Sequence, residues 1–232
     1  MKIDILSLFP SFFESPLQVS ILKRAIDNGI IDINCLDIRD FSKDKHNRVD
    51  DRPFGGGPGM VLSPQPSVDA IRSVKTESSH VVCLTPQGSL FSSQKAKELS
   101  QKKHLILFCG HYEGIDERVI QTEVDEEISI GDYILTSGCL PALVVIDAMA
   151  RYIPNVLGHP ESAYEDSFEN MRFEGPQYTR PKEFEGHVVP EVLMSGHHKE
   201  ILDYRTQKGM EKMRISRPDL YQSFMKKELI EK

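Results

Sequence analysis

The chain has 232 residues, of which 39% are hydrophobic and 27% are charged. This composition excludes a disordered chain and allows one large domain with or without a small companion. The net charge of −7 does not favour a nucleic-acid partner. Asp4 interrupts the apolar run at the start, and no stretch approaches the roughly 18 apolar residues of a membrane span. We therefore expect a soluble, cytoplasmic protein.

Strand and helix patterns alternate through the first 152 residues. In chain order they predict strand 2–9, helix 16–28, strand 31–38, helix 64–72, strand 80–84, helix 93–99, strand 104–109 and helix 140–152. Ser15 and Ser63 each precede a proline, which predicts an N-cap followed by proline at the first helical position.

Short, continuously apolar strands that alternate with helices predict an α/β fold, with a parallel sheet and helices on both faces. A ligand of such a sheet is expected beyond the carboxyl ends of the strands. The loops after Leu84, Cys109 and Ile130 are therefore candidates for the site.

The texture changes after Ile153. Residues 154–178 are rich in Gly, Pro, Ser, Asn and acids and show little periodicity, as linkers do. Helical patterns return from about Val188 to Lys208 and from Arg217 to Leu229. We expect a domain at 1–157, a linker at 158–170 and a small all-helical C-terminal domain at 171–232.

Charges and cysteines are distributed unevenly. Residues 113–132 contain eight acids and one base, whereas residues 205–227 contain seven bases and two acids. The basic stretch fits either a solvated helix face or contact with a phosphate backbone. Of the four cysteines, three are expected in buried strands and Cys139 in a loop, and the absence of a CxxC pair indicates free thiols.

Glycine-rich segments carry the chemistry. Residues 52–60 contain four glycines in five positions, which allows positive φ angles and close approach of a ligand. The segment lacks the GK[ST] ending of a P-loop, so it fits either a flexible surface loop or an RNA or phosphate contact supported by His46, Arg48 and Arg52. Segments 84–88, 109–118 and 130–141 follow predicted strands. Together they indicate a cofactor pocket, in which Tyr133 or Leu135 can pack on an adenine.

At this level of detail the sequence resembles the bacterial tRNA (guanine-N1)-methyltransferase family along essentially its whole length. The matching stretches are RPFGGGPGM at 52–60, TPQG at 85–88, GHYEGIDER at 110–118, SIGDYILTSGCLP at 129–141, VLGHPES at 156–162, EDSF at 165–168 and YTRPKEFEG at 178–186.

The resemblance implies an enzyme that transfers a methyl group from S-adenosylmethionine to N1 of guanosine 37 of tRNA, beside the anticodon, and so supports the reading frame. It implies a homodimer of the SPOUT class with a deep trefoil knot, which no pattern argument predicts. The active site would be shared between subunits. The implied cofactor-binding positions are Leu84, Pro86, Gly110, Tyr112, Ile130, Gly131, Tyr133, Leu135, Gly138 and Pro141.

The resemblance also assigns catalytic positions. Asp166 matches the base that removes the N1 proton, and Arg151 matches a cation that stabilises charge on guanine O6. Taken alone, Asp166 reads as a solvated loop charge and Arg151 as a charge at a helix C-terminus. Glu113 matches a glutamate in a family whose activity Mg²⁺ supports, but one carboxylate does not predict a metal site held by the protein.

RNA contact is expected from the glycine-rich segment and the basic helical domain, which would grip the anticodon stem-loop. The expected residues are His46, Arg52, Gly59, Lys208, Lys212, Arg214 and Arg217. The adjacent His197 and His198 are read as helix-start or RNA-facing residues rather than metal ligands, because neighbours on a helix point in different directions.

Three positions depart from the family pattern. Ser137 and Cys139 stand where the family usually has glycine and glutamate, and His111 stands where arginine is common. We expect Ser137 to be tolerated if its φ is negative, and Cys139 to remove a charge from the pocket edge. Two alternatives remain open: a SPOUT methyltransferase for another RNA position or for ribose, and an RNA-binding protein that has lost catalysis.

Overall fold

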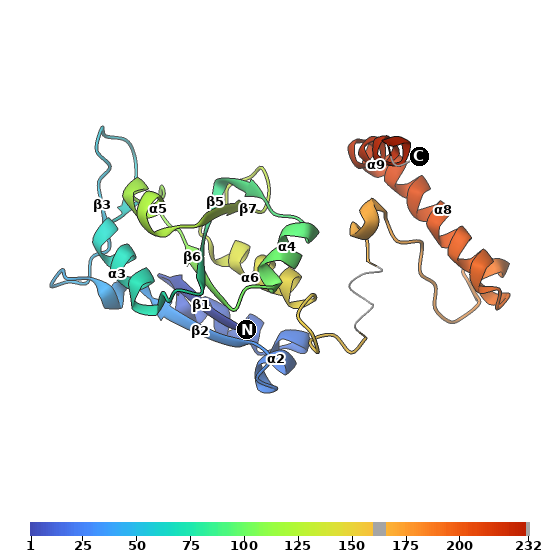
Figure 1. Cartoon of the computed structure of the whole chain (residues 1–232), viewed down its shortest axis with the longest axis horizontal. Coiled ribbons are helices and arrows are strands. Elements are labelled where there is room, and N and C mark those ends of the chain that lie inside the picture. Colours follow the sequence, from blue (N-terminus) through green and yellow to red (C-terminus); the bar gives the residue numbers. More distant parts are fainter. Residues whose placement is uncertain (160–165, 231–232) are drawn as a thin grey trace. The chain divides into compact units, whose positions relative to one another are not determined.

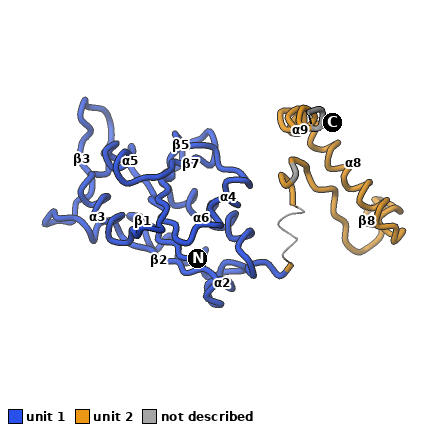
Figure 2. Tube along the Cα trace, viewed as in Figure 1, with its two compact units in different colours: residues 1–158 blue, residues 159–232 orange. Residues whose placement is uncertain are grey.

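The computed structural model describes residues 1–159 and 166–230, and the chain divides into two compact units, Met1–Gly158 and His159–Lys232 (Figures 1 and 2). The first unit is built on a five-stranded parallel sheet in the order β2-β1-β6-β5-β7. The strands are β1 Lys2–Ser7, β2 Asp32–Asp37, β5 Ser79–Leu90, β6 His104–Cys109 and β7 Glu126–Ser129. The predicted α/β fold with a parallel sheet is confirmed.

Helices cover both faces of the sheet (Figure 1). The helical elements of the first unit are η1 Pro10–Phe13, α1 Glu14–Leu17, α2 Ser20–Asp27, η2 Ile38–Phe41, α3 Pro64–Val74, α4 Ser93–Ser100, α5 Glu117–Glu123 and α6 Cys139–Ala150. Alternate strand residues point to opposite faces. In β6, Leu105 and Leu107 therefore pack with α2, α4 and α6, whereas Ile106 and Phe108 pack with α3 and α5.

Two local predictions about the first unit are wrong. Ser15 lies inside the single turn of α1 and caps nothing, and α2 begins only at Ser20. Residues 85–88 are not a turn after a finished strand, because β5 continues to Leu90 through an irregularity in its pairing with β7. By contrast, Ser63 precedes α3 in extended conformation, with Pro64 at the start of the helix, as predicted.

A buried polar network ties the amino ends of three strands together. Asp4 of β1 has no exposed surface, and its Oδ2 lies 2.7 Å from Nε2 of His104 in β6. Nδ1 of His104 lies 2.7 Å from Oγ of Ser79 in β5. Asn34 donates to Asp4 at 3.1 Å, and the Lys2 ammonium is 3.0 Å away. The carboxylate is therefore buried with partners on every side, as a buried charge requires.

The second unit contains helices and one hairpin. Its elements are η3 Glu169–Met171, β8 Glu183–Phe184, β9 His187–Val188, η4 Glu191–Met194, α8 His198–Ser216 and α9 Pro218–Ile230. The expectation of an all-helical domain is therefore wrong at the antiparallel pair β8-β9. The helix expected from about Val188 begins only at His198, because Pro190 and Gly196, with φ +76°, interrupt the segment before it. No helix among the described residues is long and apolar enough to cross a bilayer.

Candidate functional site

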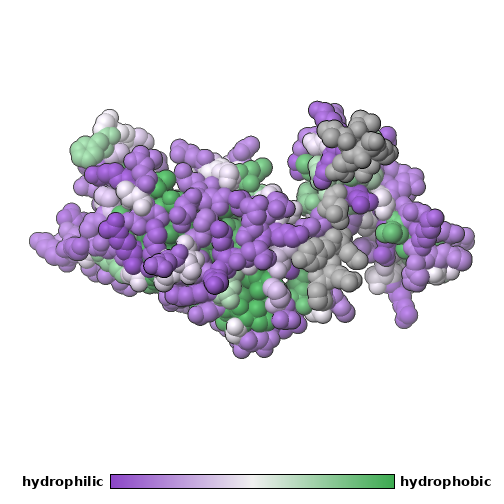
Figure 3. All heavy atoms as spheres, in the orientation of Figure 1, coloured by the Kyte–Doolittle hydropathy of each residue, from purple (hydrophilic) through white to green (hydrophobic). Residues whose placement is uncertain are grey.

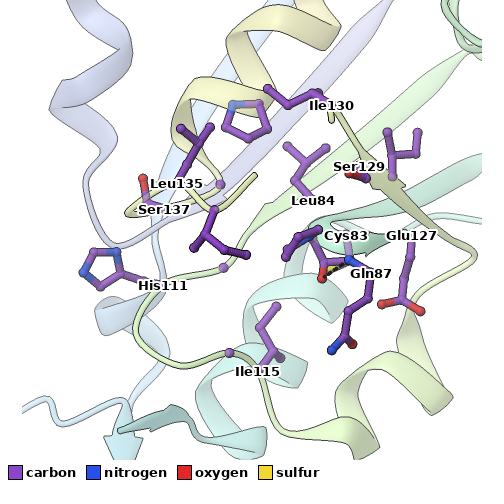
Figure 4. Close-up of a pocket in the computed structure, with 18 of the residues that line it drawn as sticks. Cys83, Leu84, Gln87, His111, Ile115, Glu127, Ser129, Ile130, Leu135 and Ser137 are labelled. Carbon is purple, nitrogen blue, oxygen red and sulfur yellow. Dashed lines mark hydrogen bonds between the residues drawn. The ribbon is translucent and has the colours of Figure 1, made fainter. Parts of the chain in front are cut away.

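A pocket of about 540 Å³ opens at the carboxyl ends of β6 and β7 and beside the irregular part of β5 that follows Leu84. It is the place that the parallel-sheet rule indicates. Its lining residues come from four stretches of chain: 83–87, 110–120, 127–131 and 133–141. His111 and Ser137 lie on one side of the pocket, and Gln87 and Glu127 lie on the other (Figure 4).

The ten positions expected to hold the cofactor all line this one pocket, as does Glu113. The structure therefore brings together three segments that are separated by up to about fifty residues in sequence. That these residues bind a ligand stays a prediction.

The inner wall is formed by a close approach of two backbones. The Gly138 amide donates to the Gly110 carbonyl at 2.8 Å. A Cβ added to Gly138 would lie 2.8 Å from the Cα of Cys109 and 3.0 Å from the Gly110 amide nitrogen. Only glycine fits this contact, which joins the loop before α6 to the end of β6.

Aromatic side chains stand at the rim. Tyr133 donates from its hydroxyl to the Ile130 carbonyl at 3.1 Å, and its ring lies over Gly131, whose φ is +152°. Tyr112 adopts φ +60°, a left-handed conformation that costs a non-glycine residue about 1 kcal/mol or more. Both rings are about half exposed. Flat, accessible rings of this kind suit stacking on a planar ligand.

The glycine-rich segment 52–60 is tied to the same pocket. The Glu113 amide donates to the Met60 carbonyl at 2.9 Å, and Gly59 packs against the Glu113 side chain. The segment runs between the short strands β3 Asp50–Asp51 and β4 Val61–Leu62. The predicted RNA contact Gly59 and the predicted catalytic Glu113 are therefore neighbours.

The outer part of this segment is open to solvent. Gly55, Gly56 and Gly57 all have positive φ, as predicted, and Phe54 is fully exposed. The side chains of His46 and Arg52 are also exposed. These features leave the segment free to meet a partner, and they do not distinguish RNA contact from a solvated loop.

His111 and Ser137 are two of the three residues that differ from the family pattern. Nδ1 of His111 is buried and has no hydrogen-bond partner among the described residues, and its ring packs on Phe9 and Tyr112 with centroids 5.1 and 4.7 Å away. A buried polar atom without a partner is rare and fits a site that awaits a ligand. Ser137 has no positive φ, so the condition set for its tolerance is met.

Cys139 is placed differently from the expectation. It is the first residue of α6, is 1% exposed and does not line the pocket, so it is neither a loop thiol nor a group at the pocket edge. Its Sγ lies 3.2 Å from Oγ of Ser7 and accepts a hydrogen bond from Cys109. The Cys109 hydrogen bond, with others from Ser137 and Ser7, lowers the pKa of Cys139 to about 6.

The expected base and cation lie in different units. Arg151 is the partly buried C-cap residue of α6 in the first unit. Asp166 is a partly buried residue of the second unit, and its carbonyl accepts from the Glu169 amide at 3.3 Å. The adjoining turn is ordered by Phe168, whose ring packs edge-on against Phe173 at 5.5 Å. Pro160 to Glu165, which includes parts of two motifs, lie outside the described residues.

The four expected basic contacts of the second unit lie on or directly after α8. Lys208 pairs with Glu211, and Arg217 pairs with Asp219, each at 2.7 Å. Lys212 and Arg214 are exposed, and neither forms an ion pair within the described part of the chain. These two cations are the most available to a polyanion. His198 begins α8, as expected of a helix-start residue.

Several polar residues of the pocket are not among the site residues predicted from the sequence, and Gln87, Glu127 and Ser129 are three of them. Gln87 and Glu127 face the cavity from β5 and β7, and Ser129 lines it beside them (Figure 4). Gln87 lies within a motif, so the motif was the available signal. The sequence contains no signal for Glu127, because this residue lies among several acidic residues that all have the pattern of surface charges.

The residues of the pocket fit a nucleoside-type cofactor. The glycine backbones of loops 110–114 and 129–138 supply amide and carbonyl groups, and the aromatic rim supplies a stacking surface. A metal is not supported in the same way, since no group of three or more His, Cys, Asp or Glu side chains among the described residues could hold one.

Comparisons with known proteins identify the family. The family model described as "tRNA (Guanine-1)-methyltransferase TrmD" matches residues 1–223. The tRNA (guanine-N(1)-)-methyltransferase of Protochlamydia amoebophila is 56% identical over 220 residues, which cover 95% of this chain and 99% of that protein. Proteins of the same name from Chlamydia pneumoniae and Chlamydia trachomatis are 56% and 57% identical, and the chain spans only 64% and 62% of their lengths. The chain belongs to the tRNA (guanine-1)-methyltransferase family.

Proposed function

We propose that this protein transfers a methyl group from S-adenosylmethionine to N1 of guanosine 37 in tRNA. The observation that carries the proposal is the agreement between the family match and the geometry of the pocket. The family match spans 223 of 232 residues, and the ten expected cofactor positions line one pocket at the carboxyl edge of the sheet.

S-adenosylmethionine, when bound, supplies an electrophilic methyl group on a sulfonium. The chain's own residues hold it in place. At the inner wall, a Cβ on Gly138 would collide with the backbone of Cys109 and Gly110, and a Cβ on Gly110 would press on the Ile115 side chain at 3.2 Å, so both glycines leave room for the ligand. Tyr133 and Leu135 offer apolar surface at the rim. Fixing the methyl group in line with the acceptor supplies much of the rate enhancement.

Guanine N1 carries a proton at neutral pH and is a poor nucleophile, so the reaction needs a base. Asp166 is proposed to remove that proton as the N1–methyl bond forms. Arg151 is proposed to stabilise the negative charge that develops on guanine O6. The guanine must also leave the anticodon-loop stack to reach such a pocket.

The homodimer and the knot belong to this proposal. Support for a dimer comes from the exposed apolar side chains of the first unit, among them Phe9, Phe12, Val19, Leu140 and Val144. Figure 3 shows hydrophobic side chains gathered on the lower face of this unit, in the region of α2. The backbone contact between Gly110 and Gly138, nearly thirty residues apart, is compatible with the tight threading of a knot.

The tRNA is proposed to lie along the cations of α8 and the segment 52–60. Lys212 and Arg214 are exposed and form no ion pair within the described part of the chain, and His46 and Arg52 are exposed too. Mg²⁺ is proposed only as an assisting ion near Glu113, held largely by the RNA, because Mg²⁺ is often bound by one carboxylate plus substrate oxygens. No step depends on it.

A single-turnover methylation assay on an anticodon stem-loop transcript tests the proposal. We expect methyl transfer when guanosine occupies the target position and none when adenosine does. Mass spectrometry of the digested RNA should give 1-methylguanosine. A 2′-O-methyl nucleoside would instead favour another SPOUT methyltransferase, and failure to bind S-adenosylmethionine would favour an RNA-binding protein without catalysis.

A further inference from the structure

Two glycines join the segment that follows Asp166 to the long helix α8. A Cβ on Gly209, inside α8, would overlap the carbonyl oxygen of Phe173 and lie 2.9 Å from its carbonyl carbon. From the other side, a Cβ on Gly175 would lie 2.6 Å from the Cα of Arg205 in α8. The two backbones therefore touch at two places, about one helical turn apart, and neither place has room for a side chain.

The position of Gly209 in the helix indicates a packing requirement. α8 has 19 residues, and glycine is a poor helix former, so a glycine well inside such a helix needs a reason. Gly209 and Met213 are the buried residues of α8, and they lie one turn apart on the same face. This face receives the segment after Asp166, whereas Lys212 and Arg214 of the same helix are exposed.

The segment forms a closed turn that begins at Asp166. The Phe168 amide donates to the Arg172 carbonyl at 2.7 Å. The Glu174 amide donates to Oγ of Ser167 at 3.2 Å. These two hydrogen bonds join the start of the turn to its end. Whatever fixes the end of the turn therefore also fixes its start, where Asp166 lies.

The turn contains backbone strain that calls for outside support. Phe168 and Met171 have φ angles of +79° and +55°, in the left-handed region that side chains disfavour. Such residues persist where the surrounding structure holds them in place. The Phe168 ring packs against the Phe173 ring at 5.5 Å, and the backbone of Phe173 and Glu174 packs on Gly209. The contact with α8 is therefore an outer support of the turn.

We propose that Gly209 is a positioning residue, which holds the Asp166 turn on α8 and so keeps the base at a fixed separation from the cations of that helix. Lys212 and Arg214 follow Gly209 within five residues in α8. The second unit thus carries both the cations for the RNA backbone and the base for the N1 proton. The inference rests on the proposed function for these two roles, whereas the contact itself does not depend on it.

A methyl group on Gly209 should displace the turn. Ordinary contacts of a Cβ are 3.4–4 Å long, so the Phe173 carbonyl must move away from α8 to admit the new carbon. A shift of about 1 Å can lower a rate by about 100-fold. We expect Gly209→Ala to lower the single-turnover rate at saturating RNA and cofactor by about tenfold or more. The affinities for the stem-loop and for S-adenosylmethionine should stay within about twofold, because the groups that bind them are unaltered.

Amide hydrogen exchange, measured by NMR on the full chain, tests the contact without reference to activity. In the wild type, the amides of Phe168 and Glu174 should be protected, because both are hydrogen-bonded within the turn. In Gly209→Ala these two amides should exchange about tenfold faster, while those of β6 should not change. Unprotected amides in the wild type, or equal exchange in the two chains, would overturn the proposal.

Two further variants make the test specific. Gly175→Ala places its Cβ against the Arg205 backbone and should have the same effects from the other side of the contact. Leu202→Ala changes a residue of α8 that is 64% exposed, and as the control it should leave exchange and rate unaltered. Thermal unfolding verifies that the variants are folded. Alanine stabilises a helix relative to glycine, so a more stable and fully active Gly209→Ala chain would contradict the packing requirement.

Single-turnover methylation of the anticodon stem-loop separates this inference from the proposed function. Faster exchange together with a lower rate and unchanged affinities supports the positioning role of Gly209. Faster exchange with a wild-type rate would show that α8 holds the turn without positioning the base, which overturns the role. A wild-type chain that binds RNA and cofactor but transfers no methyl group would overturn the proposed function instead, and hydrogen exchange would still decide whether α8 holds the turn.

Discussion

Gly138 and Cys109 approach each other so closely that a Cβ on Gly138 would lie 2.8 Å from the Cys109 Cα. This contact joins the loop before α6 to the end of β6, and Gly138 itself lines the pocket. The contact also explains why a glycine is required here, although its φ of −73° is one that any residue can adopt. Steric space, rather than backbone conformation, excludes a side chain.

Gly138→Ala should therefore destabilise the first unit by about 1–3 kcal/mol, as overpacking does. It should also weaken cofactor binding, because the methyl group pushes apart the two segments that line the pocket. Denaturant unfolding and calorimetry measure the two effects. Gly158→Ala is the control, since nothing lies within 4 Å of its added Cβ, and should change stability by no more than about 0.5 kcal/mol. Equal effects of the two variants would contradict the steric argument.

The thiolate of Cys139 predicts a pH dependence. Hydrogen bonds from Cys109, Ser137 and Ser7, with a contribution from His111, lower its pKa from 9.0 to about 6. A depressed folded-state pKa contributes stability that is complete above the unfolded value near 9 and is lost as the pH falls through about 6. Stability should therefore rise with pH between about 6 and 9, and less so in Cys139→Ser.

The thiolate can be observed directly by its ultraviolet absorbance. We expect a titration step near pH 6 in the folded chain that is absent in Cys139→Ser. Burial raises the pKa of Cys35 and Cys83 to about 11 and 12, so neither contributes in this range. A wild-type chain whose first thiolate appears only above pH 8 would contradict the assignment.

Much of the first unit could be predicted from the sequence because its strands are continuous apolar runs bounded by polar loops. β6 and the start of β5 are of this kind, whereas Asp4 interrupts the apolar run of β1 and Asn34 that of β2. The sequence does not predict α5, because its seven residues include three charged ones and are too few to show a helical pattern of apolar residues. The sequence does not predict β7 either, because the strand begins with Glu126 and Glu127 and only its last two residues are buried. The second unit was predicted less well, because its hairpin pairs only two residues per strand.

The site could be predicted in its location but not in its contacts. Glycine-bearing loops at strand ends indicated where Gly110 and Gly131 would lie. The meeting of Gly59 with Glu113, and of Cys109 with Cys139, depends on how distant segments cross in space. The pattern of apolar residues along the sequence carries no information on such contacts. The sequence therefore predicts Cys139 in a loop, whereas the structure places it in the core.

The buried pair of Asp4 and His104 gives a prediction about stability. His104→Ala removes the 2.7 Å contact to a carboxylate that has no exposed surface. Leaving a buried charge with fewer partners should cost about 3 kcal/mol. Ser79→Ala, which keeps the Asp4–His104 contact but removes the hydrogen bonds of the Ser79 hydroxyl with His104 and Thr76, should cost about 1 kcal/mol. Chemical denaturation compares the two, and a His104→Ala variant as stable as Ser79→Ala would show that the inner contact has no special weight.

Lys212 and Arg214 give a prediction about RNA binding. Replacing both with alanine should weaken binding of an anticodon stem-loop and lower the salt dependence of the association constant by about 1 to 2 in slope. Cofactor affinity should not change, because neither residue belongs to the first unit. Lys102→Ala, an exposed lysine at the opposite edge of the sheet from the pocket, is the control and should leave the slope unaltered. An unchanged slope in the double variant would remove these two cations from the RNA contact.

Asp166 gives the sharpest test of the mechanism. If it removes the N1 proton, Asp166→Ala should lower the single-turnover rate by about 100-fold or more. Affinity for S-adenosylmethionine should stay within about twofold, because Asp166 belongs to the second unit and the cofactor positions to the first. Glu174→Ala removes an exposed acid from the same segment and should leave the rate unaltered. If the variant kept near-normal turnover, the proton would have to leave by another route, and the base would have to be sought among the carboxylates that line the pocket, beginning with Glu113 and Glu127.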